Sequence, residues 1–332
     1  MSLAWSQMGN AMMGGVGDAG LGRVAITGAA GFIGSHLVDA LFRGGIDRIK
    51  ALDSLRAGRW DNLGPWLADP RLDRREADFS ALSVAELSDF LRGTDILFHL
   101  AAEKHNQAIE TPDRVWTVNV QGTWRLFEAA VAAGVKKIVF TSSLYAHGGM
   151  GGDVLDEADL PRPLTPYGIA KLAGEHIADH FQQAHGIAVA CLRLFFTYGP
   201  RQFAEGGYKS VIVRSFERLL AGHAAQINGS GKQELDYVYV GDVVDALLRA
   251  ARVDTGPQPI NIASGIGRSI IEVVSAITEA TGLNRPPEWR AADWTEGSRR
   301  VGTVARAAQI LGWRATTAFE DGLAVTYLGM RR

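Results

Sequence analysis

A chain of 332 residues is long enough for one large α/β unit with a smaller lobe, or for two modest domains. The formal net charge of −2 provides no basic surface for nucleic acid or an anionic membrane, and no apolar run is long enough to cross a bilayer. Cys191 is the only cysteine, which excludes an intrachain disulfide and a thiolate zinc cluster. We expect no metal site, and the cytoplasm is the default location.

Strand-like and helix-like segments alternate through the first two thirds of the chain. Residues 1–22 precede them and lack the basic start and apolar core of a secretion signal, so we interpret them as an N-terminal extension. We expect strands at 23–28, 48–53, 73–77, 95–100, 136–142 and 187–194, and helices at 32–43, 83–92, 112–133 and 166–185. This alternation predicts an α/β fold with a Rossmann-type, doubly wound parallel sheet.

The pattern loosens from about residue 196, where glycine-rich turns interrupt shorter elements. We therefore predict a Rossmann domain at 23–195 and a smaller, mainly substrate-binding α/β lobe at 196–332. The lobe is expected to be discontinuous, because strand-like segments near 236–263 are apolar enough to return to the first domain.

A glycine turn organises the first domain. The apolar, β-branched stretch from Arg23 to Thr27 is followed by Gly28, Gly31 and Gly34, and then by apolar residues at helical spacing. Glycine lets the backbone approach a pyrophosphate closely, and the following helix offers unpaired N–H groups and the positive end of its dipole. Asp53, at the end of the second strand, is placed to accept hydrogen bonds from an adenosine ribose, which favours NAD over NADP. Together these features predict a dinucleotide site.

Tyr167 and Lys171 are the expected reactive pair. Residues four apart lie on one face of a helix, where a lysine ammonium would lower the pKa of the phenol and prepare it to act as a base. Thr141, Ser142 and Ser143 end a strand at the sheet's carboxyl edge, where open α/β folds bind ligands. A serine that binds a substrate hydroxyl and a tyrosinate that takes its proton form a coherent catalytic unit beside a nicotinamide.

In order and spacing, these motifs resemble the extended short-chain dehydrogenase/reductases, specifically the NAD-dependent sugar-nucleotide epimerase/dehydratase branch. The resemblance runs from about Arg23 to Trp313 and includes Tyr198-Gly-Pro-Arg-Gln202 and Asn261-Ile-Ala-Ser-Gly265. It implies NAD as the cofactor, Tyr167 as catalytic base, Lys171 as its electrostatic partner and Ser143 as the contact to the substrate hydroxyl. It also implies a homodimer formed through the helices near 112–133 and 166–185.

The resemblance assigns a set of residues to the cofactor. These are Gly28, Gly31, Phe32, Ile33, Gly34, Asp53, Ser54, Asp78, Phe79, Leu100, Ala101, Ala102, Asn119, Tyr167 and Lys171. From the residues alone, a solvated loop carboxylate is as good an interpretation of Asp78, and a packed, backbone-satisfied amide is the better interpretation of Asn119.

Departures from the family pattern bear on the substrate. Leu144 and Tyr145 stand where dehydratases of the branch carry an Asp-Glu pair, which argues against dehydration. Phe196 replaces an asparagine that contacts the sugar nucleotide, and Leu235 replaces an arginine that grips the diphosphate. The residues expected at the substrate are Lys104, Ser143, Tyr145, Phe196, Arg201 and Arg299. Arg299 is expected to be the chief diphosphate contact, with Arg201 and Lys209 as weaker candidates.

The favoured function is an NAD-dependent epimerase that inverts C4 of a nucleoside-diphosphate sugar through a transient 4-keto intermediate. The loss of the family's residues at Phe196 and Leu235 keeps a second hypothesis open, a reductase or dehydrogenase of the same family that acts on a keto-sugar or a non-nucleotide substrate. A third hypothesis is a cofactor-sensing protein without turnover, against which Tyr167 and Lys171 count.

Overall fold

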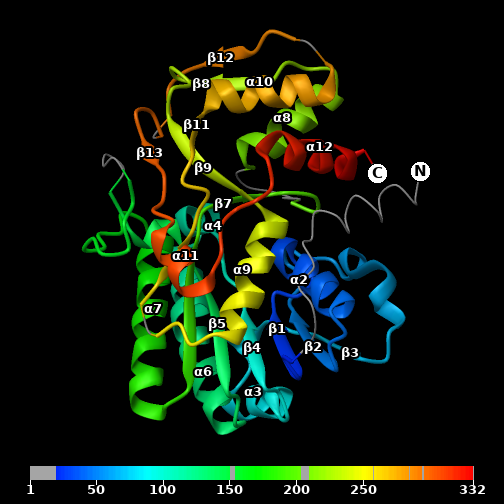
Figure 1. The fold of residues 1–332 in the computed structure, drawn as a ribbon, viewed down its shortest axis with the longest axis vertical. Helices are drawn as coiled ribbons and strands as arrows, with labels where there is room; N and C mark the ends of the chain where they lie inside the picture. Colours follow the sequence, from blue (N-terminus) through cyan, green and yellow to red (C-terminus); the bar gives the residue numbers. More distant parts are fainter. Residues whose placement is uncertain are drawn as a thin grey trace.

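The computed structural model describes residues 20–149, 154–202, 209–256, 258–283, 285–293 and 295–331. Most of the predicted N-terminal extension lies outside the described residues. Two lobes make up the described chain, a larger one built on a parallel sheet and a smaller one above it in Figure 1.

Within the described residues the large sheet has seven parallel strands in the order β10-β6-β5-β4-β1-β2-β3. They are β1 (Arg23–Thr27), β2 (Arg48–Asp53), β3 (Leu72–Glu76), β4 (Ile96–His99), β5 (Lys137–Ser143), β6 (Ala188–Leu194) and β10 (Ile260–Ile262). The strand order reverses between β1 and β4, and ligands of open α/β sheets bind at such a switch point. The predicted doubly wound sheet is confirmed.

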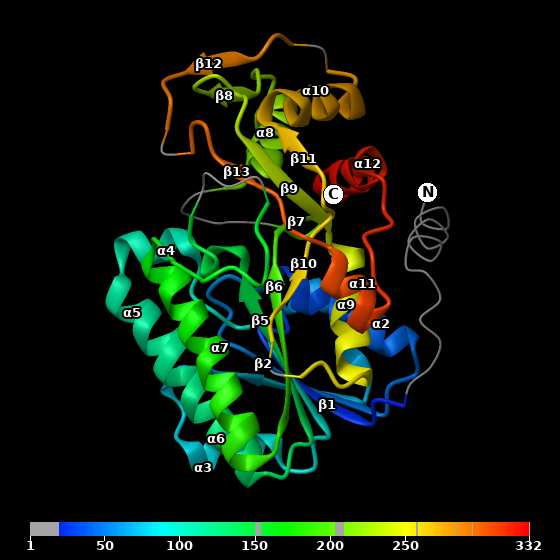
Figure 2. The ribbon, with the colours of Figure 1, turned by 60° about the vertical axis from the view of Figure 1, so that its left-hand side comes forward.

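Helices cover both faces of this sheet (Figure 2). One face carries α3 (Val84–Leu91), α4 (His105–Glu110), α5 (Pro112–Trp116), the π-helical turn η3 (Thr117–Gly122), α6 (Thr123–Ala132) and α7 (Pro166–His185). The other face carries α2 (Phe32–Arg43), α9 (Val240–Arg252) and α11 (Ala305–Leu311), with the 3-10 segment η1 (Trp60–Ala68) packed on α2.

Alternate residues of each strand enter opposite cores. In β1, Val24 and Ile26 pack with α2 and α9, whereas Ala25 packs with α3 and α6. In β5, Val139 faces the first core, and Ile138 and Phe140 face the second. Burial on both faces explains why these strands read as continuous apolar runs.

The smaller lobe surrounds a second sheet. Its central strand β9 (Glu234–Tyr239) pairs with β7 (Phe196–Tyr198), β11 (Gly267–Ser269) and β13 (Arg299–Arg300). The lobe is completed by β8 (Gln226–Asn228), β12 (Glu288–Arg290), α8 (Val211–Leu220), α10 (Ile270–Thr281) and α12 (Phe319–Met330). Two short 3-10 turns, η2 (Phe79–Ala81) and η4 (Leu144–Ala146), belong to the larger lobe.

The chain crosses between the lobes more than once after residue 195. Of the two strand-like segments expected to return to the first domain, β10 lies beside β6 in the large sheet, whereas β9 lies at the centre of the small one. Helix α9 follows β9 directly and packs on β5 and β6. Its apolar residues recur at helical spacing, which places Val244 and Leu247 against the large sheet. Among the described helices, none is long and apolar enough to span a bilayer.

Candidate active site

The glycine turn follows β1 at the switch point. Gly28 has a φ of +75°, and a Cβ there would lie 2.9 Å from the Ala101 nitrogen that follows β4. A Cβ on Gly34 would lie 2.0 Å from the Gly28 oxygen, whereas a Cβ on Gly31 would meet that oxygen at 3.2 Å and no other atom closely. Gly28 and Gly34 are therefore required by packing, and Gly31 leaves backbone open to a ligand.

Asp53 closes the same turn from β2. Its carboxylate accepts hydrogen bonds from the backbone N–H groups of Ala30 (2.9 Å) and Leu55 (2.8 Å), and burial raises the pKa of its carboxyl. Asp53 thus ties the glycine turn to the end of β2. It also lines the cavity described below, where its carboxylate can accept hydrogen bonds from a ligand hydroxyl.

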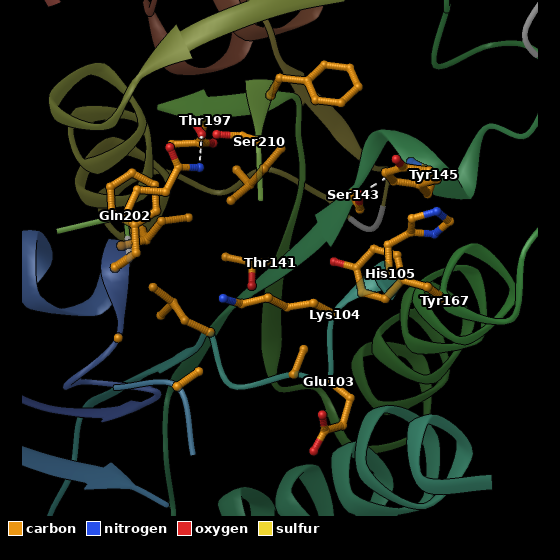
Figure 3. A pocket seen from close by; sticks show the side chains of 18 of the residues that line it. Glu103, Lys104, His105, Thr141, Ser143, Tyr145, Tyr167, Thr197, Gln202 and Ser210 are labelled. Atoms are coloured by element: carbon orange, nitrogen blue, oxygen red, sulfur yellow. Dashed lines mark hydrogen bonds between the residues drawn. The ribbon is translucent and has the colours of Figure 1, made fainter. Parts of the chain in front are cut away.

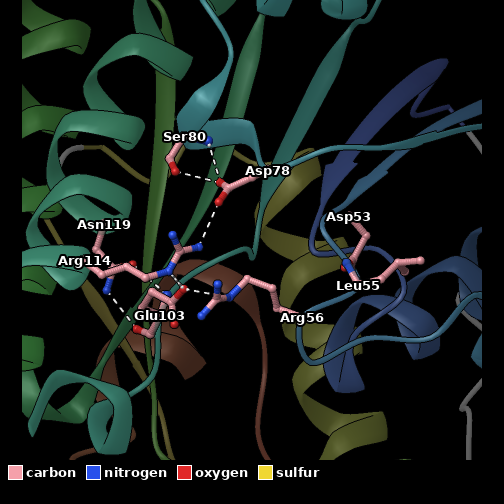
Figure 4. A network of polar contacts seen from close by, with 8 residues as sticks. All are labelled: Asp53, Leu55, Arg56, Asp78, Ser80, Glu103, Arg114 and Asn119. Carbon is pink, nitrogen blue, oxygen red and sulfur yellow. Dashed lines mark hydrogen bonds and ion pairs between the residues drawn. The ribbon is translucent and has the colours of Figure 1, made fainter. Parts of the chain in front are cut away.

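A chain of charged groups continues along this end of the sheet (Figure 4). Arg114 on α5 donates to Asp78 at 2.8 Å and to Glu103 at 2.5 Å, and Arg56 pairs with the same Glu103 at 3.4 Å. Asp78 also accepts from the backbone of Ser80, and these hydrogen bonds outweigh its desolvation and lower the pKa of its carboxyl. The network crosses from the loop after β2 to the loop after β4 and encloses one end of the site.

Asn119 stabilises that enclosure from the π-helical turn. Its side-chain oxygen accepts from the Glu103 backbone N–H at 2.8 Å, and its amide donates to the Glu103 carbonyl at 2.9 Å. It does not line the cavity, so the structure supports the interpretation of a packed asparagine satisfied by backbone.

Ser143 and Tyr167, two of the predicted reactive residues, lie near each other where β5 meets α7 (Figure 3). The Ser143 hydroxyl hydrogen-bonds Tyr167, and the Lys171 ammonium donates to the Thr141 carbonyl at 2.6 Å and lies 5.8 Å from the Tyr167 ring centroid. Thr165 caps the first turn of α7 and Pro166 begins the helix, which fixes where Tyr167 enters the site.

The expected lowering of the Tyr167 pKa does not appear in this structure. Burial raises it to about 12, with only the Ser143 hydrogen bond opposing. Burial also lowers the pKa of Lys171 to about 8, so the lysine remains mostly protonated near neutral pH. Sequence spacing places the pair on one helix face but does not report burial, which here dominates the phenol.

Sequence reasoning missed a buried ion-pair network behind these residues. Arg193 of β6 donates to Glu175 of α7 at 2.9 and 2.7 Å, and Glu175 accepts from Ser142 at 2.5 Å. Arg193 also contacts His147, whose Nε2 lies 2.8 Å from the Asn261 side-chain oxygen. Glu175 stands one helical turn beyond Lys171, and this Tyr-Lys-Glu spacing is the signal that could have revealed it.

One cavity of about 500 Å³ joins these parts and extends between the lobes. All residues predicted at the cofactor line it, except Asn119. Of the residues predicted at the substrate, Lys104, Ser143, Tyr145 and Phe196 line it as well. In Figure 3, Lys104 extends across the middle of the view, and Tyr145 and Tyr167 lie on one side of it.

The structure places the two predicted arginines elsewhere. Arg201 pairs with Asp39 of α2 at 2.6 Å, and Arg299 pairs with Glu234 of β9 at 2.9 Å; neither lines the cavity. The next residue, Arg300, lines it instead. Successive residues of a strand point to opposite faces, so the basic pair alone could not tell which arginine faces inward.

The described residues fit a dinucleotide. The cavity runs from the Gly28–Gly34 turn, past Asp53, to Tyr167, and no side chain caps the N-terminus of α2 that faces the turn. Gly28, Gly31 and Gly34 form a cradle that a Cβ at the first or third position would fill. A doubly wound fold with this cradle and a Ser-Tyr-Lys set defines a nucleotide-cofactor enzyme of the α/β class.

Comparisons with known proteins identify the family. The model of the NAD dependent epimerase/dehydratase family matches residues 24–263. A UDP-glucose 4-epimerase of Mycolicibacterium smegmatis is 36% identical over 306 residues, which cover 92% of this chain and 97% of that protein. The chain belongs to the NAD-dependent epimerase/dehydratase family.

Solved structures support the same family assignment. The UDP-glucose 4-epimerase of Thermotoga maritima with UDP-glucose matches with a TM-score of 0.86 and 30% identity, over 93% of this chain and 98% of that one. MoeE5 in complex with UDP-glucose and NAD matches with a TM-score of 0.81 and 36% identity, over 93% of this chain and 99% of that one. These findings confirm the predicted family, the fold class and NAD as the cofactor.

Proposed function

We propose that this protein is an NAD-dependent epimerase that inverts C4 of a nucleoside-diphosphate sugar through a transient 4-keto sugar. The observation that carries the proposal is the convergence of Ser143, Tyr167 and Lys171 at the point where the cofactor cradle and the substrate lobe share one cavity. The comparisons support the epimerase class predicted from the sequence.

The reaction needs a base that takes and returns the proton of a sugar hydroxyl. The phenol of Tyr167 is that group, and the Ser143 hydroxyl, which already hydrogen-bonds it, orients the same sugar oxygen. Because burial holds the phenol protonated, the cation of Lys171 must favour the phenolate when the site is filled. NAD, when bound, supplies the reversible oxidation of the sugar carbon.

Inversion requires the keto sugar to present its other face to the same groups. The proton then returns from Tyr167 to the sugar oxygen, and no net oxidation remains. A net reductase of the same fold would instead exchange its cofactor in every cycle, so cofactor dependence separates the two hypotheses.

The experiment is to purify the protein without added cofactor and incubate it with UDP-, dTDP- and GDP-hexoses, following C4 configuration by NMR. We expect bound NAD in the denatured supernatant and epimerisation without added NAD. A protein that carries no cofactor, and turns over only with added NAD(P), would be the net oxidoreductase.

We also propose a homodimer formed through α5, α6 and α7. These helices expose Trp116 (51%), Trp124 (43%) and Ile169 (47%), and large exposed apolar side chains on packed neighbouring helices mark an interaction surface. Trp124→Glu should shift the mass measured by light scattering from dimer to monomer, and an unchanged mass would place the interface elsewhere.

The cytoplasm is the proposed compartment. The support is the single cysteine, Cys191, which is buried and free, as fits a reducing environment. Fractionation of the native host would test this location.

A further inference from the structure

Arg300 is a buried cation in the wall of the substrate cavity. Its side chain, on β13, is 2% exposed, and its backbone lies in register with Leu235 of β9, another cavity residue. The neighbouring Arg299 provides a contrast, because it pairs with Glu234 and does not line the cavity.

The guanidinium of Arg300 points toward the reactive end of the cavity. Its Nη1 donates to the Tyr145 hydroxyl at 3.3 Å, and its Cζ lies 5.4 Å from the centroid of the Tyr145 ring and 5.9 Å from that of Phe196. The Tyr145 ring in turn lies 5.8 Å from the Tyr167 ring, edge to face. A single aromatic side chain therefore separates the cation from the catalytic base.

The positions of the charged groups on a sugar nucleotide indicate which of them Arg300 can reach. When C4 lies against Tyr167, the C1 oxygen that carries the diphosphate lies across the sugar ring, whereas C6 is attached to C5, the neighbour of C4. Of the anionic groups that a sugar nucleotide can carry, a C6 carboxylate is therefore the one that can come close to Tyr145, whereas the diphosphate lies farther away. Two further cations line the cavity: Lys209, which precedes α8 and pairs with Glu217, and Arg214 within α8.

We propose that Arg300 binds the C6 carboxylate of a nucleoside-diphosphate hexuronic acid, and that this acidic sugar is the preferred substrate. The inference rests on the proposed epimerase function. The planar guanidinium offers a carboxylate two parallel N–H donors, and the aromatic walls strengthen that ion pair by excluding water. The hydroxymethyl group of a neutral hexose offers no charge at this position.

The test compares UDP-glucuronate with UDP-glucose, which differ only at C6, on the full-length enzyme with its bound cofactor. We expect the unmodified enzyme to show the higher kcat/KM on UDP-glucuronate. Arg300→Met should lower that value by about 10- to 100-fold, the loss typical of a charged hydrogen bond, and change the value for UDP-glucose only a few-fold. Arg300→Lys should retain part of the preference.

Arg299→Met is the matched control and should leave both values unchanged. Bound NAD and the melting temperature report whether each variant folds. If Arg300→Met lowers both substrates equally, the arginine holds the diphosphate or only supports the fold, and the inference is wrong while the epimerase proposal stands. If neither sugar nucleotide is epimerised by the unmodified enzyme, the inference is wrong, and the screen of UDP-, dTDP- and GDP-hexoses decides separately whether the epimerase proposal stands.

Discussion

The two ends of the cavity recognise their ligands by different means. At the cofactor end, backbone makes the site: the glycine turn, the N-terminus of α2 and the backbone N–H groups that hold Asp53. At the substrate end, side chains from β7, β9 and β13 make it, namely Phe196, Leu235 and Arg300. A site made by the backbone tolerates few substitutions, because they disturb the fold. A site made by side chains can change its ligand specificity by substitution while the fold is retained. The following predictions test that contrast, beginning with the largest effect.

Tyr167 stands where the two ends meet, so its removal should separate binding from chemistry. Tyr167→Phe keeps the ring that packs beside Tyr145 and removes the proton-transfer group, and we expect a loss of kcat of about a thousand-fold. NAD content should stay unchanged, as measured in the denatured supernatant. Tyr327→Phe, on α12 and outside the cavity, is the control. Retained activity in Tyr167→Phe would remove the tyrosine from the mechanism.

Breaking the buried ion pair of the cofactor domain should cost more unfolding free energy than breaking a half-exposed ion pair of the substrate lobe. Glu175→Gln leaves the buried Arg193 without its carboxylate and should cost about 3–5 kcal/mol of unfolding free energy. Glu217→Gln breaks the half-exposed pair with Lys209 and should cost less than about 1 kcal/mol. Urea denaturation of both variants measures the unfolding free energy that each loses. Equal losses would contradict the expected difference between the buried and the half-exposed pair.

The glycine turn allows a finer comparison within the cofactor end. Gly34→Ala forces a Cβ against the Gly28 carbonyl and should destabilise the fold by about 3 kcal/mol. In Gly31→Ala, the new Cβ would lie 3.2 Å from the Gly28 carbonyl oxygen, a contact that a small shift of the backbone can relieve. This variant should therefore fold, but with a reduced NAD content. Thermal melting and NAD content are measured on both. A Gly31→Ala protein with full NAD content would show that the backbone there does not approach the cofactor.

Acid should destabilise the protein through two buried histidines. Burial lowers the pKa of His99 to about 3 and that of His36 to about 4, so between about pH 6.5 and 4 the unfolded chain binds protons that the folded chain does not. Stability is therefore lost as pH falls through this window, by about 1.4 kcal/mol per pH unit for each histidine. His99→Gln, in the large sheet, and His36→Gln, which faces the Pro200 carbonyl, should each reduce the slope; an unchanged slope would contradict the assignment.

The cofactor end could be predicted almost entirely from the sequence. Strands buried on both faces, glycines at fixed spacing and an acidic residue at a strand end are local signals, and the residues they indicated, Gly28, Gly31, Gly34 and Asp53, line the cavity. The residues that the family resemblance added line it too, except Asn119. The helix expected at 112–133 is a nearly continuous run in which a π-helical turn places Asn119 against Glu103, a detail without a local signal.

The substrate end could not be predicted in the same way. Its short strands are paired by tertiary contacts, so the sequence could not show that β9 joins the small sheet or that Arg300, not Arg299, faces the cavity. The Glu175–Arg193 pair joins residues from different elements and was also missed. The pKa of Tyr167 depends on burial, which spacing does not report.

The central claim, transient oxidation and reduction at C4, has one direct test. A UDP-hexose carrying deuterium at C4 is incubated with the enzyme in ordinary water without added NAD, and the product is read by NMR and mass spectrometry. The account predicts a C4 epimer that keeps its deuterium on C4, because the hydrogen leaves and returns to the same carbon within one site. Loss of the label to solvent, or an unchanged C4 configuration with net oxidation, would contradict it.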